Sequence, residues 1–333
     1  MLRVFEAFSG YGSQSIALRN LGIEHEVVAI SEIDKYAIKA YETIHGPTLN
    51  LGDISKIDVN DIPEHDLFTY SFPCQDLSVA GKQKGLVEGT RSGLLYECEK
   101  VIEHCRPKYL LLENVKNLVG KKFKADFDKW LEYLEGLGYT NYWKVLNAKN
   151  YGVPQNRERV FVISILGEHE PFEWPTPIPL DKCIKDILEE QVDDKYYLSD
   201  ELVDRFKKSI NKDKYPFGKE IELPCIGASR GRNPENPSSR VAGEPTEQRL
   251  EINTNGTSNT ITTVQKDNYA IEENFKIRKL TPREYFRLMG MRDDDIDKIQ
   301  EAGISNTQQY KLAGNSIVVD VLEAIFKNLF KGE

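Results

Sequence analysis

Short apolar runs alternate with stretches of helical periodicity over the first half of the chain. Apolar segments of strand length lie at 3–8, 26–31, 66–72, 108–115, 142–146 and 160–166. Between several of them, apolar residues recur at helical spacing, as in 94–105 and 123–137. Strands that alternate with helices in this way predict a mostly parallel, doubly wound sheet.

The run at 66–72 is followed by a cysteine. Pro73 lacks a donor for the strand ladder, so the strand is expected to end at Phe72 and to present Cys74 just beyond its carboxyl end. Ligands of open α/β sheets gather at that edge, which places the thiol for chemistry. Taken alone, a free cysteine is more commonly a small buried side chain, so other residues must decide between the two interpretations.

A glycine turn, Ser9-Gly10-Tyr11-Gly12-Ser13, joins the first strand to a helix. It is a partial match to a nucleotide-binding turn, because the third glycine is absent. Glu32 ends the second strand about twenty residues later, the interval at which dinucleotide-binding folds place a carboxylate for ribose hydroxyls. The turn therefore indicates either a nucleoside cofactor, including one with a charged sulfonium, or a plain strand-to-helix connection.

Two further carboxylates follow strands or turns. Asp53 comes after Gly52, where it either accepts from the amino group of a base or caps a loop. Glu113 interrupts the apolar run at 108–115, and a carboxylate at that depth is costly to bury without a role or a partner.

The composition changes after Gly167. Four prolines between 171 and 179 break regular structure, and the sequence to about residue 275 is polar and rich in turns. Residues 205–283 contain 15 Lys and Arg against 10 Asp and Glu, although the chain carries a net charge of −9. This pattern predicts a separate, irregular domain with a localised polyanion site, and solvated surface charge is an equally common cause.

Within that domain, residues 260–265 alternate enough to predict a strand. Their Thr and Gln side chains are short hydrogen-bonding groups suited to base edges, and a solvated hairpin is the alternative. Regular structure is expected to resume at Thr281-Pro282-Arg283-Glu284, a capping box, and in an apolar helical stripe at 317–329.

Cysteine, histidine and hydropathy patterns exclude several classes of protein. The five cysteines are odd in number and not closely paired, and the five histidines form no cluster with them, so we expect neither a disulfide framework nor a metal. No stretch has the length and apolar character of a membrane span, and the first residues lack signal-peptide anatomy. We therefore expect an intracellular protein without a membrane partner.

Taken together, these motifs resemble a known family. The glycine turn with Glu32, Pro73-Cys74-Gln75, Glu113-Asn114-Val115, Gln155-x-Arg157-x-Arg159 and Gly314-Asn315-Ser316 are similar, in order and spacing, to the DNA cytosine-C5 methyltransferases of bacterial and phage restriction-modification systems. The resemblance departs at Ser13, where the family has glycine. It implies a Rossmann-like α/β catalytic domain at 1–170 plus 290–333 and a smaller, β-rich target-recognition domain at 171–289.

The resemblance also implies the reaction and its residues. The expected methyl donor is S-adenosylmethionine, with no metal, and the expected contacts to it are Phe8, Gly10, Gly12, Glu32, Ile33, Asp53, Ile54 and Asn315. Cys74 is the expected nucleophile that adds to cytosine C6, because a thiolate suits reversible addition. Glu113 is expected to bind the N3 and amino edge of the base and Arg159 its O2, with Arg157 supporting Arg159.

Double-stranded DNA is the expected partner, with the target base swung out of the duplex. Arg91, in a glycine-bearing loop, is expected to close over the base, and Arg230, Arg232, Thr260 and Thr263 are expected to contact DNA. The recognition sequence is not readable from side chains alone, because readout depends on docking geometry. We expect a monomer in the bacterial cytoplasm, associated with the nucleoid when on DNA, with or without a cognate restriction endonuclease.

Three alternatives stay open on the sequence. A cytosine-C5 methyltransferase of transfer RNA has the same fold, and the large turn-rich middle domain favours DNA over it. A non-catalytic DNA-binding protein has no need of Cys74, Glu113 and Arg159 together. A nicotinamide dehydrogenase is indicated only by the glycine turn and Glu32.

Overall fold

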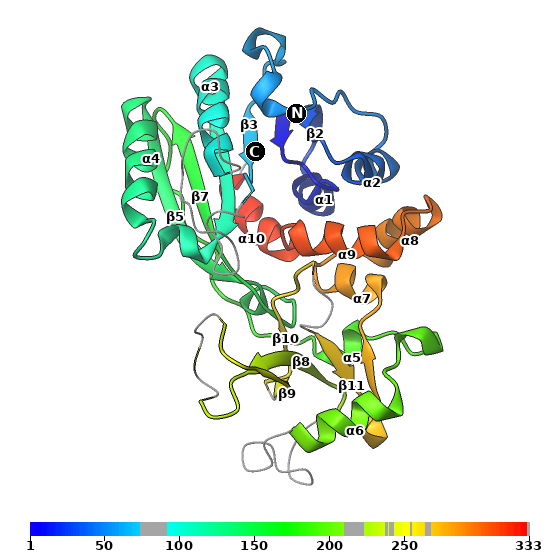
Figure 1. Cartoon of the computed structure of the whole chain (residues 1–333). Coiled ribbons are helices and arrows are strands. Elements are labelled where there is room, and N and C mark those ends of the chain that lie inside the picture. The colour runs from blue at the N-terminus through cyan, green and yellow to red at the C-terminus, as the bar shows by residue number, and fades with distance from the viewer. Residues whose placement is uncertain are drawn as a thin grey trace.

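A six-stranded sheet forms the larger part of the molecule (Figure 1). The computed structural model describes residues 1–73, 92–209, 223–236, 239, 243–253, 255–263 and 268–331. The strands of this sheet are β1 (Leu2–Ala7), β2 (His25–Ser31), β3 (Leu67–Tyr70), β4 (Tyr109–Val115), β5 (Tyr139–Asn147) and β7 (Glu158–Leu166). They lie in the order β2, β1, β3, β4, β7, β5.

The sheet is mostly parallel, as predicted. β2, β1, β3 and β4 pair in parallel, whereas β7 runs antiparallel to both β4 and β5. The carboxyl ends of β1 to β4 therefore meet at one edge of the sheet. This is the edge at which open α/β sheets bind their ligands.

Neighbouring residues of each strand supply two separate cores, because successive side chains point to opposite faces of a sheet. Val4 and Leu67 belong to one buried cluster, and Phe5 and Phe68 belong to the other. The near-continuous apolar runs in the sequence thus reflect burial on both faces.

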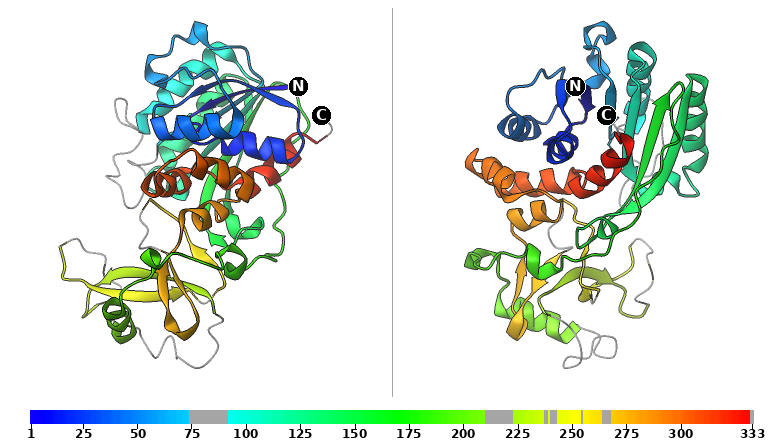
Figure 2. Two further views of the ribbon diagram at one scale, coloured as in Figure 1. Left: turned by 90° about the vertical axis from the view of Figure 1, so that its right-hand side faces the viewer. Right: turned by 180° about the vertical axis from the view of Figure 1, so that it is seen from behind.

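Helices cover both faces of the sheet (Figure 2). One cluster includes residues of α1 (Ser13–Asn20), α2 (Lys35–His45) and α10 (Val319–Leu329). The other includes residues of α3 (Leu95–Cys105) and α4 (Lys124–Gly136). The sheet is therefore doubly wound, and the apolar stripe at the end of the chain forms a helix that docks on it, as predicted.

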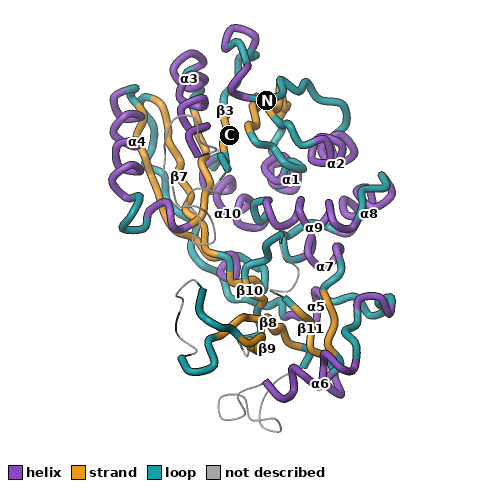
Figure 3. The backbone as a smooth tube through the Cα atoms, viewed as in Figure 1, coloured by secondary structure: helices purple, strands orange, loops and turns teal. Residues whose placement is uncertain are grey.

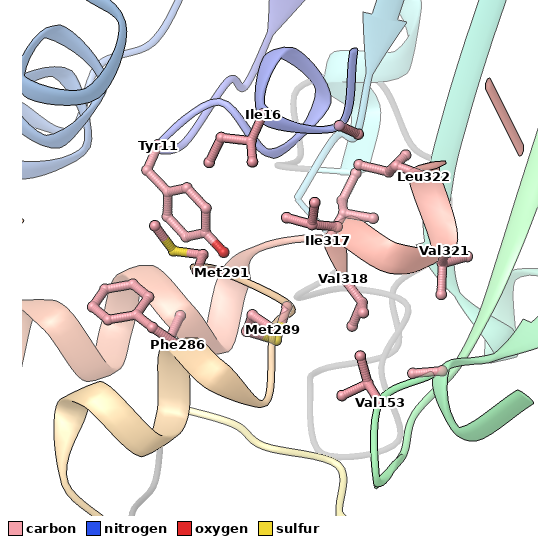
Figure 4. Packing of buried hydrophobic residues seen from close by; sticks show 14 of the residues in the cluster. Tyr11, Ile16, Val153, Phe286, Met289, Met291, Ile317, Val318, Val321 and Leu322 are labelled. Carbon is pink, nitrogen blue, oxygen red and sulfur yellow. The ribbon is translucent and has the colours of Figure 1, made fainter. Parts of the chain in front are cut away.

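Three more helices, α7 (Pro282–Arg287), α8 (Asp293–Glu301) and α9 (Asn306–Asn315), connect the second part of the molecule to α10. The predicted capping box is confirmed: Thr281 Oγ1 accepts from the Glu284 amide at 3.2 Å, and the Glu284 carboxylate accepts from the Thr281 amide at 2.7 Å. Figure 4 shows Phe286 beside Tyr11, with ring centroids 5.7 Å apart. α7 thus packs in the core shared with α1 and α10, and the predicted domain boundary at residue 289 stays a prediction.

An antiparallel sheet forms the second part of the molecule (Figure 3). Its strands are β8 (Cys225–Arg232), β9 (Glu247–Asn253), β11 (Tyr269–Ile271) and β12 (Ile277–Lys279), in the order β12, β11, β8, β9. Val203 and Phe206 of α6 (Asp200–Ser209) pack with Leu250 and Ile252 in its core. A short helix, α5 (Ile184–Ile187), precedes this sheet. We call residues 184–279 the target unit.

The predicted strand at 260–265 is wrong over its described part, residues 260–263. The strand β10 (Ser258–Asn259) pairs with β6 (Gln155–Asn156) and ends before this segment. Beyond β10, the Ile261 amide donates to Gln155 Oε1 at 3.0 Å, and Thr260 Oγ1 donates to the Asn156 carbonyl at 2.7 Å. Side-chain hydrogen bonds thus replace the ladder that a strand would need. Among the described residues, no helix has both the length and the apolar character needed to cross a membrane.

Candidate active site

A pocket of about 330 Å³ opens at the carboxyl ends of β1 to β4. Segments that follow β1, β2 and β3 form its wall, together with the end of β4, the C-terminal part of α9 and the two residues after it. Its volume lies at the lower end of the range for small-molecule sites, about 300–1,000 Å³. The pocket brings most of the predicted cofactor residues together with Glu113, Arg157 and Arg159.

Most of the predicted cofactor residues line this pocket. They are Phe8, Gly10, Glu32, Ile33, Asp53, Ile54 and Asn315. Gly12 is not among the lining residues. A Cβ at Gly12 would lie 2.5 Å from Nε2 of His45 and 2.6 Å from Cε2 of Tyr41, and φ there is 80°. Packing and backbone conformation therefore explain this glycine, and its contact with a cofactor stays a prediction that the pocket does not support.

Glu32 holds the glycine turn and the end of β2 together. Its Oε2 accepts from the Gly10 amide at 3.0 Å, and its Oε1 accepts from the amides of Ile33 and Asp34, both at 2.8 Å. An ionised carboxylate has about four acceptor positions, so these three bonds leave capacity for a ribose hydroxyl.

Asn50 is a site residue that the sequence interpretation missed. Its Oδ1 accepts from the amides of Glu32, at 3.2 Å, and Gly52, at 2.9 Å, and its Nδ2 donates to the Glu32 carbonyl at 3.0 Å. Asn50 therefore fixes Glu32 relative to the turn that carries Asp53. Its place two residues before a glycine was the available signal, because Asn side chains bond backbone amides two residues on.

The backbone after β1 is unusual for an aromatic residue. Phe8 has φ of 55° and Gly10 has φ of 58°, both in the left-handed region. A bulky residue rarely adopts this conformation, and such strain concentrates at functional sites. The turn places Phe8 and Gly10 in the pocket wall.

An ion pair also lies at the pocket, between Lys311 Nζ of α9 and Asp34 Oδ2, 2.5 Å apart. Asp34 caps α2 by accepting from the Tyr36 amide at 2.9 Å. Burial is the largest single influence and raises the pKa of Asp34. The hydrogen bond and charge of Lys311, together with the capping hydrogen bond, outweigh it, so the pKa of Asp34 lies below its usual value. The two residues are 277 positions apart, so no local pattern predicted this pair.

Glu113 and Arg159 form an ion pair in the wall of the pocket. Glu113 Oε1 lies 3.1 Å from Arg159 Nε, and the Glu113 residue is only 8% exposed. Burial raises the pKa of Glu113, and the charges of Arg159 and Arg157 reduce this rise without cancelling it. The site therefore favours a carboxyl group that keeps its proton to higher pH than usual and can donate it.

Asn114 orients the segment that leads to the predicted nucleophile. Its Nδ2 donates to the Phe72 carbonyl at 3.1 Å, and Phe72 and Pro73 line the pocket. Cys74 follows Pro73 directly but lies outside the described residues, as does Arg91. The described residues thus form the pocket wall up to the position before the cysteine.

Arg157 is placed differently from Arg159. Its guanidinium is buried and donates to the carbonyls of Ile261 at 2.9 Å, Ser316 at 2.7 Å and Gly314 at 3.2 Å. These contacts are with the backbone of the target unit and with the backbone at the C-terminal end of α9. The predicted catalytic support of Arg159 by Arg157 stays a prediction, because the printed hydrogen bonds of Arg157 hold other segments.

Two of the predicted DNA-contacting residues, Arg232 and Thr260, make hydrogen bonds within the protein. Arg232 binds Glu251 through two hydrogen bonds, one of them 2.7 Å from Nη2 to Oε2, and Thr260 donates to a backbone carbonyl. Arg230 is half-buried in β8, where it lies directly opposite Arg249 of β9, and Thr263 is exposed. Among the described residues, no group of three or more His, Cys, Asp or Glu is arranged to hold a metal ion.

Comparison with known proteins shows which family this chain belongs to. The family model of the C-5 cytosine-specific DNA methylases matches residues 2–331. The chain belongs to this family. The methylase is 40% identical to the type II methyltransferase M2.ScrFI of Lactococcus lactis subsp. cremoris, over the whole of both chains. It is 33% identical to the orphan methyltransferase M.SPBetaI of Bacillus phage SPbeta, over 98% of this chain and 97% of the phage protein.

Solved structures share the fold of the methylase. The crystal structure of the Dnmt2 methyltransferase of S. pombe aligns with a TM-score of 0.66 at 21% identity, covering 99% of both chains. A DNMT2 mutant of Spodoptera frugiperda aligns with a TM-score of 0.73 at 19% identity, over 99% of this chain and 100% of that one. The predicted fold and family are confirmed, and family membership excludes the nicotinamide dehydrogenase. The chain is a DNA cytosine-C5 methyltransferase, and its family implies S-adenosylmethionine as methyl donor.

Proposed function

We propose that Cys74, Glu113 and Arg159 carry out methyl transfer on a cytosine swung out of duplex DNA. The observation that carries this assignment is the Glu113–Arg159 pair, 3.1 Å apart, in the same pocket as Glu32, Asn315 and the residue before Cys74. A proton donor, a fixed cation and a cofactor wall then surround the space that the base enters. Extrusion of the base costs a few kcal/mol, which contacts in the pocket offset.

The steps follow from the electronic structure of cytosine. The Cys74 thiolate bonds to C6, and the electron pair of the C5–C6 double bond shifts through C4 to N3, which takes the proton of Glu113. Arg159 stabilises the charge that grows at O2. The shifted pair returns through C5 to bond the methyl group that a bound sulfonium would supply, and the electron pair of the broken S–C bond would stay on that sulfur. The C5 proton then passes to water, and its bonding pair re-forms the C5–C6 double bond and expels the Cys74 thiolate from C6. N3 returns its proton to Glu113.

The pocket residues fit S-adenosylmethionine, which when bound supplies an electrophilic methyl group on a sulfonium. Glu32 has acceptor capacity for ribose hydroxyls, and Asp53 can accept from the adenine amino group. Hydrogen bonds from Ser55 and the charge of Lys56 lower the pKa of Asp53, so it is ionised as this role requires. Ile33 is 73% exposed, so its apolar side chain is available to pack against the adenine of the cofactor. No metal is required by any of these steps.

For DNA, we assign the phosphate contacts of the target unit to Arg230 and Arg249 rather than to Arg232. The two arginines lie directly opposite each other in β8 and β9, so their side chains share one face of the sheet. Like charges in this arrangement repel, and Glu247 lies near Arg249 only at 4.0 Å, so an anion placed between the two arginines reduces the repulsion further. The carboxylate of Glu251 already neutralises Arg232.

The remaining assignments rest on the relatives. Their names include type II and orphan methyltransferases, which supports methylation of a short specific duplex sequence with or without a cognate endonuclease. We propose a monomer that acts in the bacterial cytoplasm and associates with the nucleoid through its DNA substrate.

Covalent trapping tests the proposal. Duplex DNA that contains 5-fluorocytosine at the target should form a stable adduct with the wild type and none with Cys74→Ser, while Cys74→Ser still binds unmodified DNA. Cys183→Ser is the matched control, because Cys183 is exposed and free, and it should trap normally. Trapping by Cys74→Ser would refute the assignment of the nucleophile.

A parallel assay separates DNA from transfer RNA as substrate. With a labelled methyl donor, we expect incorporation into duplex DNA, and bisulfite sequencing of DNA from an expressing host should reveal the modified sequence. Incorporation into transfer RNA alone would replace DNA as the proposed substrate.

A further inference from the structure

The guanidinium of Arg157 lies between two segments that come from distant parts of the chain. One is the segment 260–263, which follows β10 in the target unit, and the other is residues 314–316, which comprise the last two residues of α9 and the residue that follows it. Arg157 donates to Ile261 in the first, and to Gly314 and Ser316 in the second, over 2.7–3.2 Å. One side chain therefore fixes the distance between the two segments.

The two segments also touch directly at Gly314. A Cβ at this position would lie 2.7 Å from the carbonyl carbon of Thr262 and 2.8 Å from the amide nitrogen of Thr263. These neighbours are backbone atoms, which cannot rotate away as a side chain can. A shift of residues 262–263 is therefore transmitted to Gly314.

The two segments are held to different parts of the molecule. Gly314, Asn315 and Ser316 line the cofactor pocket. On the other side, Gln155 accepts from the Ile261 amide at 3.0 Å and donates to the Leu288 carbonyl at 2.6 Å. Gln155 thus secures the segment 260–263 to the body of the protein where the chain leaves the target unit.

The geometry of arginine suits this position. A buried guanidinium is costly without partners, and its planar fork presents five donors in fixed directions. Arg157 is 3% exposed and uses these donors on carbonyls of two segments at once. The compact ammonium of lysine is a point charge without such a fork, so Arg157→Lys should keep the charge and lose the simultaneous contact.

We propose that Arg157 is a positioning residue that links DNA binding to cofactor binding. DNA held by the target unit sets the position of residues 261–263, which through Arg157 and Gly314 sets the position of residues 314–316 in the arrangement that binds the cofactor. By linkage, the cofactor tightens DNA binding by the same factor. This inference rests on the proposed function, because it takes the target unit as the part that binds DNA.

The test measures binding, not activity. The dissociation constant of S-adenosylhomocysteine is measured by calorimetry with and without saturating duplex DNA that carries the target sequence. In the wild type we expect DNA to lower this constant at least about fivefold, within the usual range of such couplings. In Arg157→Lys, the ratio of the dissociation constant without DNA to that with DNA should fall to within about twofold of one. Gly314→Ala, which forces the two backbones apart, should reduce the ratio as well.

Arg106→Lys is the matched control. Arg106 also donates from Nη2 to a backbone carbonyl, that of Leu137, but neither residue lines the cofactor pocket. It should keep the wild-type ratio, and unfolding temperatures identify variants that are merely destabilised. A wild-type ratio in Arg157→Lys, or a ratio of one in a wild type that binds DNA tightly, would overturn the inference. Failure of the wild type to bind any duplex DNA would instead overturn the proposed function.

Discussion

Glu113 Oε1 lies 3.1 Å from Arg159 Nε, on the adjacent antiparallel strands β4 and β7. Two effects oppose each other in this pair. Burial raises the pKa of Glu113, whereas the neighbouring guanidinium groups lower it, and the rise is the larger effect. The arrangement therefore orients the carboxyl group without forcing it to ionise.

We predict that Glu113→Gln lowers the single-turnover rate of methyl transfer at least about 100-fold, because general acid catalysis contributes about 10²–10⁴-fold. The amide can occupy the same space and donate a hydrogen bond, but it cannot transfer a proton to N3. Binding of S-adenosylhomocysteine and of DNA should stay within about twofold of wild type, which calorimetry and anisotropy measure.

The pH profile gives a second readout for the same variant. The protonated form of Glu113 is the active one, so the wild-type rate should fall as pH rises through the raised pKa, and this alkaline limb should be absent in Glu113→Gln. Glu158→Gln is the control, because Glu158 is exposed and binds Lys116 instead. An unchanged rate in Glu113→Gln would remove Glu113 from the mechanism.

For the target unit, we predict that Arg230→Gln and Arg249→Gln each make the slope of log K against log salt concentration about 0.9 less steep. Each variant loses one phosphate contact, so affinity should fall equally for specific and non-specific duplexes. The measurement is fluorescence anisotropy at several salt concentrations. A loss confined to the specific duplex would instead assign these arginines to base readout.

The ion pair in the same hairpin supplies the control. The double variant Arg232→Gln with Glu251→Gln removes one charge of each sign and should leave the salt slope unchanged. A decrease of about 0.9 in this variant would mean that Arg232 exchanges its carboxylate for a phosphate.

The residues that could be predicted from the sequence are those whose signal is local. Strands buried on both faces read as short apolar runs, and the carboxylates at their ends, Glu32 and Glu113, interrupt these runs, so both were found and both line the pocket. Asp34 and Lys311 were missed because their ion pair forms only when segments 277 residues apart fold together.

The errors have equally specific causes. Residues 260–263 alternate like a strand, but Gln155 and Asn156 take up their hydrogen-bonding groups from another part of the chain. The glycine turn did not distinguish a glycine that approaches a ligand from one that packs against protein. Gly10 lines the pocket, whereas Gly12 packs against His45 and Tyr41.

Gly12→Ala is therefore expected to destabilise the protein. A left-handed conformation costs a non-glycine residue about 1–2 kcal/mol, and overpacking against His45 and Tyr41 adds about 1–3 kcal/mol. Gly22→Ala isolates the first effect, because φ at Gly22 is 70° and nothing lies within 4 Å of the added Cβ. Denaturant unfolding should rank the wild type first, Gly22→Ala second and Gly12→Ala last. Equal losses in the two variants would argue against the packing explanation.

Glu6 provides a prediction about stability and pH. It lies fully buried in β1, where its Oε1 accepts from Ser15 Oγ at 2.8 Å near the hydroxyl of Tyr41. Burial raises the pKa of Glu6 from 4.5 to about 7, against smaller effects of the hydrogen bonds from Ser15 and Tyr41. Because the folded-state pKa is raised, the native protein binds the proton more tightly than the unfolded chain does. The stabilisation is fully present below pH 4.5 and is lost as pH rises through 7.

We predict that the difference in unfolding free energy between wild type and Glu6→Gln changes by about 3 kcal/mol between pH 4.5 and 8, to the disadvantage of the wild type at high pH. The difference between the two proteins is measured because His45 also changes the stability of both with pH. Burial lowers the pKa of His45 to about 4, so His45 makes the folded state more stable as pH rises from 4 to 6.5, and this effect cancels in the comparison. The exposed Glu26 of β2 supplies the control, and Glu26→Gln should leave the profile unchanged. If the difference in unfolding free energy does not change with pH, Glu6 is ionised in the folded protein. A cation or water would then lie near Oε2 of Glu6, which has no hydrogen-bond partner among the described residues.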